Sequence, residues 1–449
     1  KNEVTYYLSM EEALKEPVNV RRLDLTWQYM LTLPTGIEQF VNLEELNLGW
    51  NKLTILPKSI LSLPRLKKLA LNNNPRLYLK KVMQQLQELQ QLEELSIGWD
   101  EMNELPDEIV GLSSLKSLQI LCDSSINLSE TLLSLGNLKR LESLSLRGNK
   151  LGRMDENIRY LENLRYLDIS GNSIPQLTSR IGRLKKLREL NLRGNELPNI
   201  PDGISSLKDL RLLNLADNQI IEVPARISTF TELNNLTLSE NSINKISGKI
   251  TNLSLLRHLD LSRNAISTLP VNMDNLNKLE YLDLSLNSLT ELPNSIENIK
   301  TLKVFKVNNN AGVNYLRFFK NIDGFVNLQE LNLSANELDS LPVSISGMSN
   351  LRELNLSTNR LRYLANEFSA LRRLKVLDLS ANEIRNIPES IFKMPSLEVL
   401  NLDFNKIAYI PESIGQMRSL KEISLRYNPI PEREIKKLRK LLPDAKINR

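Results

Sequence analysis

Apolar and polar residues follow one short pattern, LxxLxLxxN, along the whole chain: leucines alternate with variable residues, and a polar residue closes the motif. The closing residue occurs at eighteen positions, which are Gln28, Asn51, Asn74, Asp100, Asp123, Asn149, Asn172, Asn195, Asn218, Asn241, Asn264, Asn287, Asn310, Asn336, Asn359, Asn382, Asn405 and Asn428. Fourteen of the seventeen steps between them are 23 residues long and three are 26 residues long. This regularity predicts one continuous array of eighteen repeats.

Each repeat predicts a short strand, a turn and a return path. A complete repeat reads LRHLDLSRNAISTLPVNMDNLNK from Leu256. The alternation in LxL predicts a strand with one buried face. The closing Asn can satisfy backbone groups of the following turn, so the fifteen asparagines above are expected to form a structural ladder. The proline opens the return path, and one repeat alone cannot bury its apolar face, so stacking must supply the stability.

The two ends of the chain predict caps. Ser9 and Glu12 have the spacing of a capping box, and Pro17 would end the short helix that follows. Near the C-terminus, apolar residues lie on one face of a predicted helix at Ile435, Leu438, Leu441 and Leu442. We therefore expect an N-terminal cap over residues 1–19, eighteen repeats over 20–428 and a capping helix within 429–449.

The three longer repeats are expected to carry helices on the side opposite the strands. After Asn74 the apolar residues of RLYLKKVMQQLQELQQL follow helical spacing, and the segment VNYLRFFKNIDGF after Asn310 is similar.

The chain resembles the leucine-rich repeat proteins over essentially its whole length, and the LP step within each repeat resembles the class found in Gram-negative bacteria. Similar repeats occur in Ras-binding intracellular scaffolds. This resemblance implies an α/β leucine-rich repeat solenoid, a right-handed superhelical or horseshoe arc. Its concave face would be a parallel β-sheet of about 18 strands, and its convex side would hold 3-10 and short α segments.

Nothing in the sequence predicts an enzyme. The one cysteine, Cys122, and the one histidine, His258, stand six repeats apart, or roughly 30 Å at the spacing of neighbouring strands. A nucleophile and its base need about 3 Å, so the two residues form no catalytic pair, and we expect neither a metal nor a cofactor. No apolar run approaches the roughly 18 residues that would span a membrane.

Charge is distributed unevenly over the predicted surface. We call the first leucine of LxL the anchor, the residue two before it the edge position, and the residue four after it, directly before the closing residue, the turn position. Four positions are expected to face outward from the sheet: one before the anchor, and one, three and four after it. They carry fourteen acidic and seven basic residues, although the net charge of the whole chain is +5. The edge position carries eleven basic residues against five glutamates. We interpret this edge as a solvated rim that balances neighbouring carboxylates, and the acidic sheet opposes nucleic-acid binding.

All three tryptophans occupy the turn position, in repeats 1, 2 and 4, where strand spacing predicts a stripe roughly 15 Å long. Clustered exposed aromatics anchor protein interfaces. The predicted partner-binding ledge consists of Trp27, Trp50 and Trp99 with Asp24, Glu45, Asn73 and Glu94. Alternatively, the indoles shield the corner between strand and turn and have a structural role only.

The same position is glycine in repeats 6–8 and aromatic again near the C-terminus. A distal patch of Asp403, Phe404, Arg426 and Tyr427 is therefore expected. A weaker candidate lies one residue before the anchor, at Tyr166, His258 and Tyr281.

The sequence favours a monomeric, non-catalytic module that binds a protein partner of unknown identity on its concave face. A cell-surface protein that binds glycans through the tryptophans is the first alternative, and a self-assembling structural protein is the second. Export to a bacterial surface is favoured over the cytoplasm, because of the family resemblance and the missing initiator Met.

Overall fold

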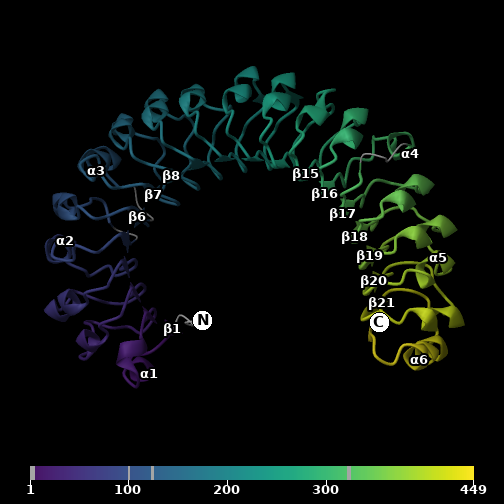
Figure 1. Ribbon diagram of the computed structural model, residues 1–449, viewed down its shortest axis with the longest axis horizontal. Coiled ribbons are helices and arrows are strands. Elements are labelled where there is room, and N and C mark those ends of the chain that lie inside the picture. The colour runs from purple at the N-terminus through teal and green to yellow at the C-terminus, as the bar shows by residue number, and fades with distance from the viewer. Residues whose placement is uncertain (1–5, 100–101, 123–125, 321–324) are drawn as a thin grey trace. The chain divides into compact units, whose positions relative to one another are not determined.

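The computed structural model describes residues 6–99, 102–122, 126–320 and 325–449. The chain divides into two compact units, Lys1–Gln219 and Ile220–Arg449, which we call the first and the second unit. In each unit the strands lie along the inner side of the stacked coils and the helical segments along the outer side (Figure 1). The closing positions Asp100 and Asp123 lie outside the described residues.

The described residues of the first unit form ten parallel strands, each paired with the next along the chain. They are β1 (Tyr6–Tyr7), β2 (Arg22–Asp24), β3 (Glu45–Asn47), β4 (Lys68–Ala70), β5 (Glu94–Ile97), β6 (Ser117–Ile120), β7 (Ser143–Ser145), β8 (Tyr166–Asp168), β9 (Glu189–Asn191) and β10 (Leu212–Asn214). Equivalent residues of successive repeats are in register, as in the pairing of Leu23 with Leu46. Side chains at one position of the repeat therefore form a column across the sheet.

The second unit repeats this arrangement. Its parallel strands are β12 (Asn235–Thr237), β14 (His258–Asp260), β15 (Tyr281–Asp283), β16 (Val304–Lys306), β17 (Glu330–Asn332), β18 (Glu353–Asn355), β19 (Val376–Asp378), β20 (Val399–Asn401), β21 (Glu422–Ser424) and β22 (Lys446–Asn448). Two further short strands, β11 (Glu222–Val223) and β13 (Lys245–Ile246), pair with each other in a separate parallel sheet. The prediction of a parallel sheet is confirmed: over the described parts of the chain, eighteen strands come from the repeats, and β1 and β22 add one terminal strand to each unit.

Short helical segments close the core opposite the strands. The α-helices are α1 (Met10–Ala13), α2 (Leu79–Leu86), α3 (Leu128–Leu135), α4 (Tyr315–Phe318), α5 (Glu389–Phe392) and α6 (Glu432–Leu441). The 3-10 segments are Pro17–Asn19, Ile37–Gln39, Lys58–Ser62, Asp107–Gly111, Glu156–Tyr160, Ser179–Arg183, Asp202–Ser206, Ala225–Thr229, Gly248–Asn252, Met273–Asn275, Asn294–Asn298, Val343–Gly347, Asn366–Ala370 and Glu412–Gln416. Helices α2, α3 and α4 belong to the three longer repeats, which confirms the expectation of extra helix there.

The ends of the chain combine helix with strand. The Ser9 hydroxyl accepts a hydrogen bond from the Glu12 amide at 3.2 Å, so α1 begins as the capping box predicts. At the other end Ile435 and Leu438 of α6 are fully buried. The carboxylate of Glu434 accepts a hydrogen bond from the Ile410 amide at 3.1 Å, which fixes α6 to the preceding coil. The sequence pattern predicted these helices but not strands β1 and β22.

The closing asparagines contact the backbone of their own coil and of the previous one. Asn172 is representative and fully buried. Its amide donates to the carbonyls of Leu146 and Ile169 at 2.9 Å and of Ser170 at 3.1 Å. Its side-chain oxygen Oδ1 accepts a hydrogen bond from the backbone N–H of Asn149 at 2.8 Å. One side chain thus satisfies backbone groups that stacking would otherwise bury without partners.

The turn position has a left-handed backbone in almost every repeat. Its φ is positive at every repeat except at Trp99 and Cys122, and it reaches 61° at Trp27 and 57° at Trp50. Residues other than glycine adopt this conformation at a cost of about 1–2 kcal/mol. The glycines of repeats 6–8 therefore suit the left-handed conformation that this position requires. The pattern of hydrophobic residues does not reveal that requirement.

We expect Gly148→Ala to lower the free energy of unfolding by about 1 kcal/mol, although a Cβ there would meet no atom within 4 Å. The cost arises from the φ of 71° alone. Gly248→Ala is the matched control, because its Cβ also meets open space and its φ is not positive. That control should be neutral or stabilise by about 0.4–1 kcal/mol. Equal effects of the two changes in urea unfolding would contradict the assignment of strain to the turn position.

Candidate functional site

Two of the three tryptophans form a stacked pair at the turns that follow β2 and β3. The ring centroids of Trp27 and Trp50 are 4.3 Å apart, with 14° between the ring planes. The side chains remain 58% and 45% exposed. The repeat length places the second ring directly beside the first, since the two residues are 23 positions apart. The pair covers one face of each ring and leaves the remaining apolar surface open to solvent.

Trp99 does not continue this pair. It is half-buried, its backbone lacks the left-handed φ of the turn position, and the positive φ of its repeat, 120°, lies at Gly98. Asn73 occupies the intervening turn with a φ of 56°. The expected stripe of three equivalent indoles is therefore a pair of exposed indoles and a third of different conformation.

Further large apolar side chains are exposed in the first repeats. Tyr29 is 67% exposed, with the Lys52 ammonium 5.2 Å from its ring centroid. Exposed apolar side chains of the same part of the chain include Tyr6, Leu8, Leu31, Ile55 and Tyr78. We call these residues together with Trp27 and Trp50 the N-terminal aromatic surface. Tyr29, Leu31, Ile55 and Tyr78 escaped the sequence prediction because they lie after the closing residue rather than on the strands, and Tyr6 and Leu8 because they precede the first repeat.

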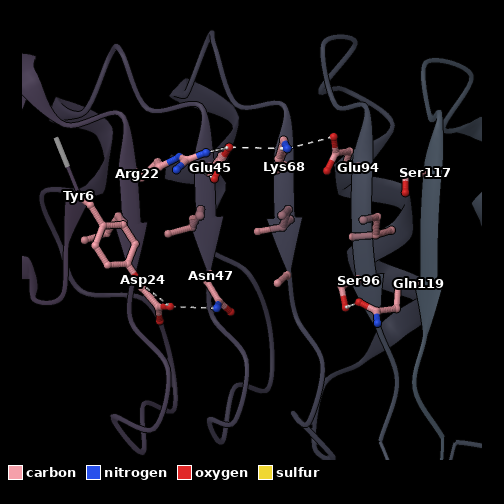
Figure 2. A pocket seen from close by; sticks show the side chains of 15 residues that line it. Tyr6, Arg22, Asp24, Glu45, Asn47, Lys68, Glu94, Ser96, Ser117 and Gln119 are labelled. Atoms are coloured by element: carbon pink, nitrogen blue, oxygen red, sulfur yellow. Dashed lines mark hydrogen bonds and ion pairs between the residues drawn. The ribbon is translucent and has the colours of Figure 1, made fainter. Parts of the chain in front are cut away.

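The strands near this surface carry a hollow of about 370 Å³, lined by polar side chains and by the anchor leucines between them. Figure 2 shows its residues on neighbouring strands in two rows. In the first row Glu45 is 2.9 Å from Arg22 and 3.6 Å from Lys68, and Lys68 is 3.1 Å from Glu94. The hydrogen bond to Glu94 raises the pKa of Lys68. The predicted site carboxylates Glu45 and Glu94 are thus paired with cations, which the sequence prediction had not included.

The second row consists of hydrogen-bonded polar groups. Asp24 accepts hydrogen bonds from the Tyr6 hydroxyl and from the Asn47 amide, both at 3.1 Å (Figure 2). Ser96 donates to the Gln119 side chain at 3.2 Å. Asp24 therefore belongs to a network on the strands, while the tryptophans lie where those strands end.

The residues of the distal patch also lie together, in the second unit. The rings of Phe404 and Tyr427 stack at 4.2 Å with 15° between planes, and the side chains are 55% and 73% exposed. The Asp403 carboxylate accepts a hydrogen bond from the Arg426 amide at 2.7 Å. Both rings occupy left-handed turn positions, as the stacked tryptophans do.

The weaker candidate divides between the two units. His258 and Tyr281 of the second unit stack at 4.1 Å, and the Tyr281 hydroxyl donates to Asp283 at 3.1 Å. Burial lowers the pKa of His258 and raises that of Tyr281. Tyr166 is in the first unit, where its hydroxyl lies 3.4 Å from its acceptor Asp168. We assign no common site to the three residues.

The edge position forms ion pairs between neighbouring coils over much of the chain. Arg21 is 2.7 Å from Glu44, and Lys116 is 2.8 Å from Glu93. In the second unit Glu398 lies between Lys421 at 2.6 Å and Lys375 at 2.9 Å. Hydrogen bonds from these two lysines lower the pKa of Glu398 to about 2. The balanced rim that the charge pattern predicted is present at these coils.

The described residues contain no group of three or more His, Cys, Asp or Glu side chains that could hold a metal ion. Cys122 is buried in the first unit, whereas His258 is half-buried in the second. None of the helices in the described part of the chain is long and apolar enough to cross a membrane.

Solved structures show the same fold. A leucine-rich repeat protein of Leptospira interrogans is 30% identical, and the match covers 99% of this chain and 100% of that protein, with a TM-score of 0.64. The structure of a TLR13–ssRNA13 complex is 22% identical over 96% of this chain and 68% of that one, with a TM-score of 0.71. The ectodomain of the Arabidopsis thaliana receptor kinase GASSHO1/SCHENGEN3, in complex with CASPARIAN STRIP INTEGRITY FACTOR 2, is 24% identical over 96% and 58%, with a TM-score of 0.57.

No curated protein sequence matches the chain. Two family descriptions do match: "Leucine-rich repeat region" covers residues 9–157, 153–247 and 241–359, and "Leucine rich repeat" covers residues 372–430. The Leptospira relative suggests a bacterial origin. With the family pattern matched over most of its length and a relative of the same length at 30% identity, the chain belongs to the leucine-rich repeat family.

Proposed function

We propose that this chain is a non-catalytic recognition module that binds a protein partner through the N-terminal aromatic surface and the adjoining strands β2–β5. The exposed Trp27–Trp50 stack carries the proposal. Large aromatic side chains dominate the energetics of protein interfaces, and burying their remaining exposed area would drive association. Stacked coils also hold the rings in place before binding, which reduces the entropy lost on association.

The ion pairs on the adjoining strands support a protein partner. Glu45 is already compensated by Arg22 and Lys68, so this part of the sheet presents alternating charge rather than a uniformly acidic surface. Such a surface suits the polar rim of a protein interface, with the aromatic pair as its apolar centre. The leucine-rich repeat fold is a common scaffold for protein recognition, and the Arabidopsis ectodomain is an example, solved in complex with CASPARIAN STRIP INTEGRITY FACTOR 2.

The stacking weakens the glycan alternative. Flat, separated indoles would offer each sugar ring a free face, whereas Trp27 and Trp50 cover one face of each other at 4.3 Å. The stacked geometry of the pair therefore favours a protein partner over a glycan, although the number of tryptophans alone would be compatible with either.

A partner isolated by crosslinking should bind Trp50→Ala at least about 30-fold more weakly than the parent chain, equivalent to about 2 kcal/mol at a central anchor. Unfolding of the variant should shift by no more than about 1.5 kcal/mol, the usual value of an aromatic pair. Tyr363→Ala is the control, because this side chain is 62% exposed and lies in the second unit. Titration calorimetry measures all three affinities.

Three results would reject the proposal, the first by its binding surface and the other two by its class of partner. Equal weakening by Trp50→Ala and Tyr363→Ala would remove the aromatic surface from the interface. Retention of a defined oligosaccharide on a glycan array, lost in Trp50→Ala, would instead support the glycan alternative. Mass that rises with concentration in sedimentation, and falls in Trp50→Ala, would identify self-association.

A further inference from the structure

The balance of charge along the edge fails in one stretch of the first unit. At the positions five, four and two residues before the anchor, repeats 5–9 carry nine basic residues against three acidic ones, whereas repeats 1–4 carry three against two. We define the basic strip as Lys139, Arg140, Arg165, Lys186, Arg188 and Arg211. All six side chains are exposed.

A hollow of about 270 Å³ lies within this strip. Lys116, Lys139, Arg140, Arg165 and Lys186 line it, together with Asn163 and a single carboxylate, Glu142. That carboxylate is already 3.2 Å from Arg165. Lys116 is paired with Glu93 at 2.8 Å, so the five cations around the hollow still outnumber the two carboxylates that pair with them.

The geometry of the hollow is held by neutral contacts. The Lys186 ammonium donates to the Asn163 side chain at 2.8 Å, and the Asn163 amide donates to the carbonyl of Lys139 at 3.0 Å. The Lys139 ammonium donates to the carbonyl of Gly136 at 2.7 Å. These oxygens orient both ammonium groups without neutralising them, which leaves their charge for an anion.

Three arginines continue the strip across neighbouring coils. The Arg188 amide donates to the Arg165 carbonyl at 2.8 Å, and the Arg211 amide donates to the Arg188 carbonyl at 2.7 Å. Like charges on adjacent strands, about 4.7–4.9 Å apart, destabilise each other. Within the described residues, no carboxylate lies within ion-pair distance of Arg188 or Arg211. An anion along this row would replace repulsion with charge-assisted hydrogen bonds.

From these contacts we propose that the basic strip binds a linear sulfated polysaccharide, with one sulfate group in the hollow and others along the arginine row. Planar guanidinium groups match the oxygens of such tetrahedral anions well. This site is separate in sequence and chemistry from the N-terminal aromatic surface, and it does not depend on the proposed protein partner.

Nucleic acid fits the strip less well. No aromatic residue occupies the three lateral positions of repeats 5–9, so the bases of a single strand would find no stacking platform there. A duplex broad enough to extend onto β8 and β9 would meet Asp168 and Glu189, which the high charge density of its phosphates disfavours.

The test compares dextran sulfate with unsulfated dextran of the same length, at low and at physiological salt, by fluorescence anisotropy. The parent chain should bind only the sulfated polymer, and added salt should weaken binding steeply. The variant Arg188→Gln with Arg211→Gln should bind about tenfold more weakly or worse. Its melting temperature should stay the same or rise, because two repelling charges are removed.

The matched control is Arg352→Gln with Arg372→Gln, which removes the same charge from exposed lateral positions of the second unit. Its affinity should stay within about twofold of the parent. Equal loss in both double variants would show attraction to net charge alone and overturn the proposal. Equal binding of unsulfated dextran, no binding at low salt, or tighter and equally variant-sensitive binding of oligothymidylate or polyglutamate would also overturn it.

Discussion

Replacing Asn172 by alanine is expected to lower the free energy of unfolding by about 3–5 kcal/mol. The side chain is fully buried and joins two coils. The substitution removes the partners that the Leu146 carbonyl and the Asn149 backbone amide have at 2.8–2.9 Å. The Ile169 carbonyl loses one of two donors and keeps the Asn195 side-chain amide at 3.0 Å. Each buried group that loses its partner costs about 1–3 kcal/mol, and water has no route into the gap without opening the stack.

Urea unfolding monitored by circular dichroism measures the total effect, and hydrogen exchange at the amides of β7–β9 shows where it acts. Because the coils interact mainly with their neighbours, loss of protection should spread from β8 along the first unit rather than appear everywhere at once. Asn252→Ala, at an exposed position, is the control and should change stability by less than about 0.5 kcal/mol.

Asn172→Asp separates the two halves of the asparagine's role. The aspartate keeps the oxygen that accepts from Asn149 but loses the donors to three carbonyls and places a charge in the buried turn. We expect it to be at least as destabilising as alanine at pH 7. If either variant unfolds within about 0.5 kcal/mol of the parent, the ladder does not stabilise the stack as we infer.

The periodic part of the fold could be predicted because every repeat has the same spacing of apolar and polar residues. Leucines at fixed spacing determine which side of each strand is buried, and one proline and one isoleucine locate the return path. Helix α2 followed the same logic, since its buried residues Val82, Met83 and Leu86 have helical spacing. Strands β1 and β22 could not be predicted in this way, because they are single additions whose pairing depends on the coil beside them.

The candidate site was only partly predictable. Trp27 and Trp50 occupy the same position of successive repeats, so the sequence predicted that they share a column and lie next to each other. The pattern contains no information on φ, so the left-handed backbone of the column and the exception at Trp99 were missed. Charge counting over the whole edge position likewise averaged balanced pairs such as Arg21 and Glu44 with the unbalanced arginines near Arg188, which only the contacts distinguish.

Phe305 shows the same limit in the core. The anchor is leucine in every repeat except at Phe305 and Ile423, yet β16 keeps the register of its neighbours. The ring fits because repeat 13 is one of the longer repeats: its centroid is 6.4 Å from that of Phe318 in α4 and 6.0 Å from that of Phe325. The Phe305 ring thus packs against aromatic side chains that the longer repeat supplies.

We therefore expect Phe305→Ala to cost about 3–5 kcal/mol, because rigid neighbouring coils cannot collapse into the cavity. Phe305→Leu restores the usual anchor but leaves part of the ring volume empty beside Phe318, and should cost roughly 1–2 kcal/mol. Urea unfolding and hydrogen exchange at β15–β17 measure both, with the exposed Tyr363→Ala as control. Equal costs for alanine and leucine would show that ring packing against α4 is not what the phenylalanine provides. A cost below about 1 kcal/mol for alanine would mean that the cluster is loosely packed, and that the longer repeat is accommodated by its backbone rather than by its aromatic side chains.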